Sequence, residues 1–342
     1  MTNFDEQMMH RCIELAQNGF GTTYPNPMVG CVIVHQEKII SEGWHKKSGE
    51  PHAEVNAIQK IFNKEILKNS TLYVSLEPCA HQGKTPPCAD LIISHNIPKV
   101  VVGTKDPFAK VNGLGIQKMK NAGIEVVTDV LEEECRQLNK RFFTFHKEKR
   151  PYVILKWAQT ANGLMATEEG EQKWITNEFS KQLVHKWRTE EQAVLVGTNT
   201  AKSDNPQLSA RLWGGTQPVR LVLDKELKLN SALNLFDGSQ RTIVFTKKEA
   251  MNQPNLEFIQ IPFDSDLPEV ILQKLYELEI QSVIIEGGKT TLETFVKKHL
   301  WDEARVFTSS TRWEAGVKSP ELNGKLINTE TIASDRLEIF VQ

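Results

Sequence analysis

The chain has 342 residues, of which 25% are charged and 39% are hydrophobic, with a formal net charge of −2 at pH 7. This composition is typical of a globular protein of about two domains and excludes an intrinsically disordered chain. The near-neutral charge gives no general attraction to nucleic acid or anionic lipid, so we expect an anionic substrate to be held by local residues.

Several other classes of protein are excluded by simple patterns. There is no apolar run of the roughly 18 residues that a transmembrane helix needs, and residues 1–12 carry acids where a signal peptide has a basic flank. Five cysteines are too few for a disulfide scaffold, and their number is odd. We therefore expect a cytoplasmic protein with free or metal-bound thiols and no membrane partner.

Strands and helices alternate in the first part of the chain. Apolar spacing predicts helices at 4–17, 52–62, 87–96, 114–121 and 132–146. It predicts strands at 28–35, 38–43, 71–76, 99–103 and 124–127, the first two of which should form a hairpin. This alternation indicates an α/β domain with a mostly parallel sheet and helices on both faces.

A second α/β series follows the basic run 146–150 and Pro151, which together indicate a domain boundary. We expect domains at 1–147 and 148–342. Strands are predicted at 152–158, 193–197, 219–224, 242–246, 282–286, 305–309 and 337–341, with the last two closing the sheet. Helices are predicted at 178–188 and 290–298.

Three short segments of the first domain carry metal-ligating residue types. They are His52-Ala53-Glu54, Glu77-Pro78-Cys79 and Pro86-Pro87-Cys88. One imidazole and two thiolates suit a zinc ion that keeps a fourth position open for water. The same residues would also be compatible with two core cysteines and a surface histidine. Three further cysteines, Cys12, Cys31 and Cys135, lie on apolar helices or strands and are predicted to be buried, inert thiols.

The zinc hypothesis leads to a specific reaction. Zinc lowers the pKa of a bound water, and Glu54 can take the proton of that water and return it to a ring nitrogen and to leaving ammonia. This is the chemistry of zinc deaminases, whose signature is H-x-E followed by P-C-x-x-C. Here the spacing departs from the signature, because eight residues separate Cys79 from Cys88.

The longer spacing belongs to a wider set of motifs. The segment 77–88 (EPCAHQGKTPPC) and the segment 25–34 (PNPMVGCVIV) closely resemble the bifunctional deaminase/reductase family of riboflavin biosynthesis. Further matching segments are 43–45, 49–54, 106–107, 111–115 and 122–124.

This resemblance implies a cytidine-deaminase-like domain in which His52, Cys79 and Cys88 bind zinc and Glu54 is the catalytic proton shuttle. It also implies that Asn26, His45 and His81 line the pyrimidine or its ribose phosphate. From the residues alone, both histidines could equally lie in exposed loops, and Asn26 could simply shape a turn between two prolines.

The second domain has weaker motifs. It lacks a G-x-G-x-x-G segment after its first strand, but Glu286-Gly287-Gly288 ends a predicted strand and opens a helix. Backbone N–H groups at such a point can hold a pyrophosphate, although a plain strand-to-helix turn has the same pattern.

The order of the short motifs here resembles the reductase domain of the same family, which has a dihydrofolate-reductase-like fold. The resemblance implies NADP contacts by Ala158, Trp174, Thr200, Asp204, Gly288, Lys289, Thr290, Thr291 and Leu292. It implies substrate contacts by Gln172, Arg188, Leu208, Arg211 and Glu286. Arginine binds phosphate bidentately, which suits Arg188 and Arg211; without the resemblance both would be read as surface arginines, and Trp174 could be a core residue.

Three positions depart from the pattern of the family. Asn162 precedes Gly163 where aspartate is common, Gln172 stands where a small hydroxyl residue is usual, and Lys225 replaces a serine or threonine. Gln172 puts one substrate contact in doubt, whereas Lys225 would favour a 2′-phosphate. None of the three removes a requirement of hydride transfer, for which the cofactor carries the chemistry.

The family resemblance implies a two-step enzyme with zinc and NADPH as cofactors. Its first domain would deaminate 2,5-diamino-6-ribosylamino-4(3H)-pyrimidinone 5′-phosphate, and its second would reduce the ribosyl group to ribityl. The expected partners are this small substrate and, at most, further copies of the chain in a homo-oligomer. Three alternatives stay open: a nucleic-acid base deaminase with an accessory domain, a deaminase with a degenerate reductase domain, and a non-enzymatic zinc-stabilised module.

Overall fold

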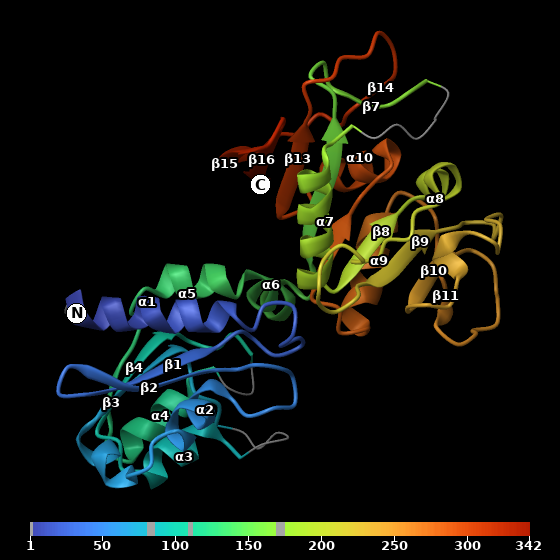
Figure 1. Ribbon diagram of the computed structural model, residues 1–342. Coiled ribbons are helices and arrows are strands. Elements are labelled where there is room, and N and C mark those ends of the chain that lie inside the picture. Colours follow the sequence, from blue (N-terminus) through green and yellow to red (C-terminus); the bar gives the residue numbers. More distant parts are fainter. Residues whose placement is uncertain (1–2, 81–85, 109–111, 169–174) are drawn as a thin grey trace. The chain divides into compact units, whose positions relative to one another are not determined.

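The computed structural model describes residues 3–80, 86–108, 112–168 and 175–342. Contacts along the chain divide it into two compact units, Met1–Glu148 and Lys149–Gln342 (Figure 1). Each unit contains its own β-sheet and its own hydrophobic clusters. Among the described residues, no helix is long and apolar enough to cross a membrane.

The sheet of the first unit has five strands in the order β2-β1-β3-β4-β5. The strands are β1 (Gly30–His35), β2 (Lys38–Trp44), β3 (Thr71–Leu76), β4 (Lys99–Thr104) and β5 (Glu125–Val127). β1 pairs antiparallel with β2 and β3, whereas β3, β4 and β5 are parallel. The sheet is therefore mixed rather than mostly parallel, because Gln36 and Glu37 (φ 48° and 60°) form a two-residue hairpin turn that reverses the chain.

Helices cover both faces of this sheet, as the alternation of elements predicts (Figure 1). They are α1 (Asn3–Gln17), α2 (Ala53–Gln59), α3 (Cys88–Ser94), α4 (Leu114–Asn121), α5 (Glu132–Leu138) and α6 (Lys140–Glu148), with a 3-10 helix at Lys64–Asn69. α2, α3 and α4 pack on one face of the sheet, and α1 and α5 pack on the other. Alternate strand residues point to opposite faces, so each face has its own hydrophobic cluster.

The predicted helix at 132–146 is broken at Asn139. The side-chain amide of this buried residue donates to Met28 O and accepts from Met28 N, both at 2.8 Å. Asn139 thus forms a tertiary hydrogen-bonded pair, and its own backbone (φ −106°) leaves the helical range. Long-range pairing of this kind has no local sequence signal, so the apolar spacing predicts one continuous helix across Asn139.

The second unit contains a nine-stranded sheet in the order β11-β10-β9-β8-β12-β6-β13-β16-β15. Its strands are β6 (Tyr152–Gln159), β8 (Ala193–Val196), β9 (Val219–Leu223), β10 (Thr242–Thr246), β11 (Leu256–Gln260), β12 (Ser282–Ile285), β13 (Glu303–Thr308), β15 (Lys325–Ile332) and β16 (Asp335–Val341). Pairing is parallel from β11 to β13 and antiparallel for β16 and β15. β16 therefore does not end the sheet, contrary to the prediction. β15 was not predicted because nearly all its residues are exposed and lack an apolar alternation.

Helices α7 (Glu178–Glu190), α8 (Thr198–Asp204), α9 (Leu267–Glu277) and α10 (Lys289–Lys297) accompany this sheet, together with a 3-10 turn, η2 (Asn234–Phe236), and a small pair of strands, β7 (Leu164–Ala166) and β14 (Val317–Lys318). α8 follows β8 and α10 follows β12, and these two strands are parallel neighbours. The N-termini of both helices therefore lie at the carboxyl edge of the sheet, where ligands bind in open α/β sheets.

Candidate functional sites

The three predicted metal ligands meet in the first unit. His52 is the N-cap residue of α2, Cys79 follows β3, and Cys88 is the first residue of α3. His52 Nδ1 lies 3.6 Å from Cys79 Sγ and 3.3 Å from Cys88 Sγ, and one ligand atom from each residue falls within 4.8 Å of the others. Three segments distant in sequence thus converge at one point.

These distances fit a zinc ion. Tetrahedral geometry with Zn–S of about 2.3 Å and Zn–N of about 2.1 Å separates sulfur from nitrogen by about 3.6 Å. The thiol of Cys88 and the imidazole of His52 lower the pKa of Cys79, which favours its thiolate, whereas the contact with Cys79 and burial raise the pKa of Cys88. Among the described residues this cluster offers three ligands, so a fourth position is left for water.

Glu54 lies in the first turn of α2, two residues after His52, and is only 3% exposed. Burial raises the pKa of its carboxyl group. A buried carboxyl group beside three metal ligands is placed to exchange protons with groups at the open position.

Asn26 and His45 lie beside this cluster. Asn26 Nδ2 is 3.1 Å from His45 Nε2, and His45 Nδ1 is 3.2 Å from the carbonyl oxygen of Pro51, the residue before His52. Both contacts are satisfied when the neutral imidazole carries its proton on Nδ1. Burial lowers the pKa of His45 and so favours this neutral form. His81 lies outside the described residues.

Glu77 is a buried residue of this site to which the sequence analysis gave no role. Its carboxylate accepts four backbone N–H groups at 2.8–3.3 Å, those of Asp106, Gly113, Gly115 and Ile116. A Cβ on Gly115 would lie 2.0 Å from the carbonyl oxygen of Pro78, so only glycine allows this approach. Glu77 thereby holds Asp106 and the segment 113–116 against the turn that carries Cys79.

The remaining cysteines agree with the prediction. Cys12, Cys31 and Cys135 are buried free thiols, and burial raises the pKa of each. They are therefore not activated as nucleophiles or metal ligands.

A cavity of about 480 Å³ opens in the second unit. Six residues predicted to bind cofactor or substrate line it: Arg188, Thr200, Asp204, Leu208, Arg211 and Glu286. Lys156 and His185 also line it and were not predicted, although His185 stands three residues before Arg188 on the same face of α7. The spacing of His185 and Arg188 was the signal available in the sequence.

Arg188 and Glu286 form a buried ion pair. Arg188 Nε and Nη2 each donate to a Glu286 oxygen at 2.8 Å, and Nη1 donates to the carbonyl oxygen of Ser209. Arginine has five N–H donors, and these bonds use three of them. Only the other two remain for a phosphate. Arg211 is exposed and makes only a long contact, 3.4 Å, with Ser209 Oγ, so it is the more available arginine.

The ion pair determines the electrostatics of the cavity. Burial alone would raise the pKa of Glu286, but Arg188 and Lys156 lower it to about 2. Burial lowers the pKa of His185, and Arg188 and Arg211 lower it further, to about 4. At neutral pH the cavity therefore combines an ionised Glu286 with a neutral His185.

Two glycine turns form a cradle next to α8 and α10. The N–H of Gly197 donates to the carbonyl oxygen of Gly287 at 2.8 Å, and Gly288 is the N-cap of α10. A Cβ on Gly288 would lie 3.0 Å from Thr200 Oγ1, and one on Gly197 would lie 2.5 Å from Thr291 Oγ1. A glycine backbone flanked by the Thr200 and Thr291 hydroxyls at the start of a nine-residue helix is compatible with the pyrophosphate of a nicotinamide dinucleotide.

The other predicted cofactor residues are distributed around this cradle. Ala158 is half-buried near the end of β6, and Thr290 is exposed. Lys289 Nζ lies 3.5 Å from Glu293 Oε1. Leu292 is fully buried in the core, so its side chain packs against protein and only its backbone could face a ligand. Trp174 and Gln172 lie outside the described residues.

Two of the three positions that depart from the family pattern, Asn162 and Lys225, lie among the described residues. Asn162 accepts from Thr160 Oγ1 at 2.9 Å and donates to the carbonyl oxygen of Trp313 at 2.7 Å, so it holds the turn before β7 in place. Lys225 follows the end of β9 and is exposed.

Comparison with protein families gives two matches. Residues 2–104 match the family described as the cytidine and deoxycytidylate deaminase zinc-binding region. Residues 151–311 match the family described as the RibD C-terminal domain. The first match contains all three proposed metal ligands, and the second contains the cavity of the second unit.

Several relatives match along most of the chain. The riboflavin biosynthesis protein RibD of Aquifex aeolicus (strain VF5) is 44% identical over 308 residues, which cover 89% of this chain and 86% of that protein. The RibD protein of Escherichia coli (strain K12) is 34% identical over 322 residues, covering 89% of this chain and 87% of that protein.

Solved structures agree with these relatives. A diaminohydroxyphosphoribosylaminopyrimidine deaminase/5-amino-6-(5-phosphoribosylamino)uracil reductase of Thermotoga maritima superposes with a TM-score of 0.90 at 39% identity, covering 99% of this chain and 98% of that chain. Acinetobacter baumannii RibD, form 1, gives a TM-score of 0.90 at 33% identity, with coverage of 99% and 98%.

Proposed function

The chain belongs to the RibD family of bifunctional deaminase/reductase enzymes in riboflavin biosynthesis, and we propose that each unit performs one of the two reactions. This membership sets aside the nucleic-acid base deaminase and the non-enzymatic module. We assign deamination to Met1–Glu148 and reduction to Lys149–Gln342. The observation that carries the assignment is the convergence of His52, Cys79 and Cys88 beside the buried carboxyl group of Glu54.

The proposed substrate of the first unit is the diaminopyrimidine ribosyl phosphate that the Thermotoga enzyme is named for. His52, Cys79 and Cys88 would hold a zinc ion, which would supply Lewis acidity and lower the pKa of a bound water. Glu54 would accept one proton of this water and deliver it to a ring nitrogen, and would then carry the second proton, from the hydroxyl on the ring carbon, to the leaving amino group. A carbonyl oxygen replaces the exocyclic amine, and ammonia leaves.

Asn26 and His45 are proposed to hold the pyrimidine or its ribose phosphate at this site. Their contact with each other and with Pro51 O fixes both side chains next to His52 before substrate arrives. Such preorganisation supports productive orientation, because little side-chain freedom remains to be lost on binding.

The second unit is a reductase domain and so uses a nicotinamide cofactor. We propose NADPH, with its pyrophosphate at the glycine cradle formed by Gly197 and Gly288, and with Lys225 favouring the 2′-phosphate. When bound, the cofactor would supply a hydride to C1′ of the ribosyl group. The bond between C1′ and the ring oxygen would open, and a proton from water would reach that oxygen to give the ribityl chain. Arg211 is proposed to bind the substrate phosphate. The Arg188–Glu286 ion pair and Lys156 form a charged side of the same cavity.

The direct test uses the purified protein with the diaminopyrimidine ribosyl phosphate and NADPH. We expect ammonia release and NADPH oxidation in equal amounts, and slower oxidation when NADH replaces NADPH. Ammonia release without NADPH oxidation would overturn the reductase assignment and favour a degenerate second unit. Absence of ammonia release from zinc-loaded protein would overturn the deaminase assignment.

A further inference from the structure

One wall of the cavity in the second unit is a five-residue segment that we call the 204–208 wall. Its members Asp204, Asn205, Pro206, Gln207 and Leu208 all line the cavity. Two of them have left-handed backbones, Asn205 with φ 41° and Leu208 with φ 49°. Asparagine tolerates this conformation, but leucine does so only where the surroundings impose it. The wall therefore needs support from outside the segment.

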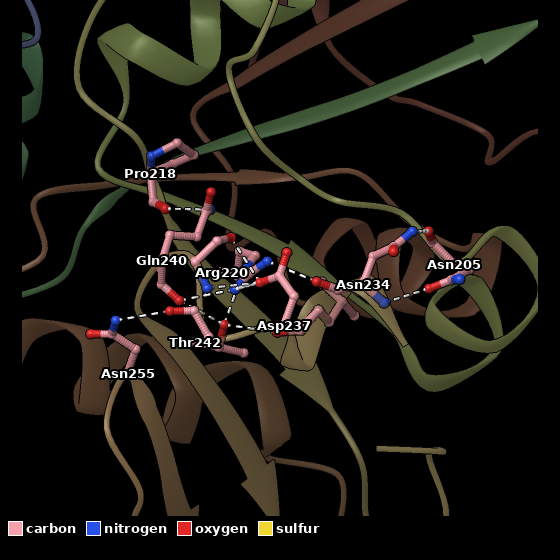
Figure 2. A network of polar contacts seen from close by, with 11 residues as sticks. Asn205, Pro218, Arg220, Asn234, Asp237, Gln240, Thr242 and Asn255 are labelled. Carbon is pink, nitrogen blue, oxygen red and sulfur yellow. Dashed lines mark hydrogen bonds and ion pairs between the residues drawn. The ribbon is translucent and has the colours of Figure 1, made fainter. Parts of the chain in front are cut away.

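That support comes from Asn234, the first residue of η2, which itself also lines the cavity. Its backbone N–H donates to Asn205 Oδ1 at 2.7 Å, and its side-chain Nδ2 donates to the carbonyl oxygen of Asn205 at 2.8 Å (Figure 2). The two bonds join the same pair of residues and so restrict both the side chain and the backbone of Asn205. They fix the left-handed turn that ends α8 and begins the 204–208 wall.

Asn234 is in turn anchored by Arg220, which lies on β9 and is 1% exposed. Arg220 Nη1 donates to the carbonyl oxygen of Asn234 at 2.9 Å. Its Nη2 donates to Asp237 Oδ1 and to the carbonyl oxygen of Gln240, and its Nε donates to Thr242 Oγ1 (Figure 2). A buried guanidinium with these partners ties the segment 234–242 to the rigid sheet.

We propose that Asn234, held by Arg220, is a positioning residue for the reductase cavity, because it keeps the 204–208 wall in its ligand-binding conformation through Asn205. This inference rests on the proposed reductase function of the second unit. The wall meets the ligand in the ground state and in the transition state alike. Loosening it should therefore raise KM and leave kcat nearly unchanged, as expected when uniform binding is lost.

The test is Asn234→Ala, which removes the Nδ2 donor and keeps the backbone N–H. We expect KM for NADPH or for the pyrimidine to rise by about three- to tenfold, the factor for about one net hydrogen bond, with kcat within about twofold. Ammonia release by the first unit should not change. The matched control is Gln240→Ala, which removes a hydrogen bond from the same segment to the carbonyl oxygen of Pro218 and leaves the path to Asn205 intact. Equal KM values for the two variants would overturn the proposal.

A double variant tests whether Asn234 acts through Asn205. Asn205→Gly keeps the left-handed turn and removes Oδ1. Asn234→Ala removes the other bond of the pair, from Nδ2 to the carbonyl oxygen of Asn205, which Asn205→Gly keeps. If both bonds hold one turn, the double variant should raise KM by a factor that differs from the product of the single effects. A full product would indicate independent contacts and would overturn the positioning role.

Failure of the proposed function has a different signature. Wild-type protein that binds NADPH without oxidising it would refute the reductase function. The Kd of NADPH for the same variants, from fluorescence titration, would then decide the positioning role by the same comparison.

Discussion

Replacing Glu286 with glutamine tests the electrostatic account of the second unit. The change Glu286→Gln keeps the shape of the side chain and removes its charge, so Arg188 is left as a buried cation without its counter-ion. The two side chains are 9% and 10% exposed, and screening by solvent and salt is therefore small.

The magnitude follows from the pKa of Glu286. A fall from 4.5 to about 2 corresponds to about 3 kcal/mol of stability, at about 1.4 kcal/mol per pH unit. Because the pKa is lowered in the folded state, this contribution is fully present above pH 4.5 and is lost as the pH falls toward 2. Removing one partner of a buried ion pair typically costs about 3–5 kcal/mol, which agrees with this value. We expect Glu286→Gln to lower the free energy of unfolding of the second unit by about 3 kcal/mol at pH 7.

Tryptophan fluorescence during urea unfolding can follow this unit. Trp44 is the only one of the seven tryptophans in the first unit, so the signal reports mainly on the second. The control is Glu226→Gln, which breaks an exposed pair with Lys248 and should leave the urea midpoint nearly unchanged. A loss below about 1 kcal/mol for Glu286→Gln, or a loss that does not shrink below pH 4.5, would refute the argument.

Two further changes test the first unit. Asn139→Ala removes both hydrogen bonds to Met28, which lies two residues after Asn26; we expect a loss of about 2 kcal/mol in stability, measured by thermal unfolding of the first unit, and a raised KM for deamination. An unchanged deamination KM would argue against a role of this pair in holding Asn26. Removal of zinc with a chelator should stop ammonia release and leave NADPH oxidation on the deaminated intermediate intact, which parallel assays of the two products can measure. Ammonia release at the original rate from metal-free protein would contradict the zinc assignment.

The metal cluster was predictable because each of its ligands stands in a short, recognisable sequence motif. His52 and Glu54 are two residues apart, and each cysteine follows a proline at the edge of a predicted element. The ligand types alone limit the chemistry, and the spacing of Cys79 and Cys88 points to the family. The strands that position these ligands are apolar runs, which sequence patterns detect well.

The organisation of the second cavity was less accessible. Arg188 and Glu286 are 98 positions apart, and no local pattern indicates that each satisfies the other. The family resemblance implies that Arg188 contacts the substrate, and in the structure three of its five donors bond to Glu286 and Ser209. The same limit applies to Asn234 and Asn205, whose pairing depends on how two loops meet at the sheet edge.

Local patterns also misled where tertiary contacts override them. Asn139 interrupts an apolar helical period because its amide pairs with Met28. The physical cause is a hydrogen-bonding partner 111 positions away in the sequence.

The central claim is that one chain carries two separate reactions, and Glu54→Gln tests it most directly. The variant keeps the size of the side chain and removes its capacity to accept a proton. Ammonia release from the diaminopyrimidine substrate should fall by at least about a hundredfold, while NADPH oxidation on the deaminated intermediate stays at the wild-type rate. Retained ammonia release, or loss of both activities in a protein that is still folded, would contradict the account.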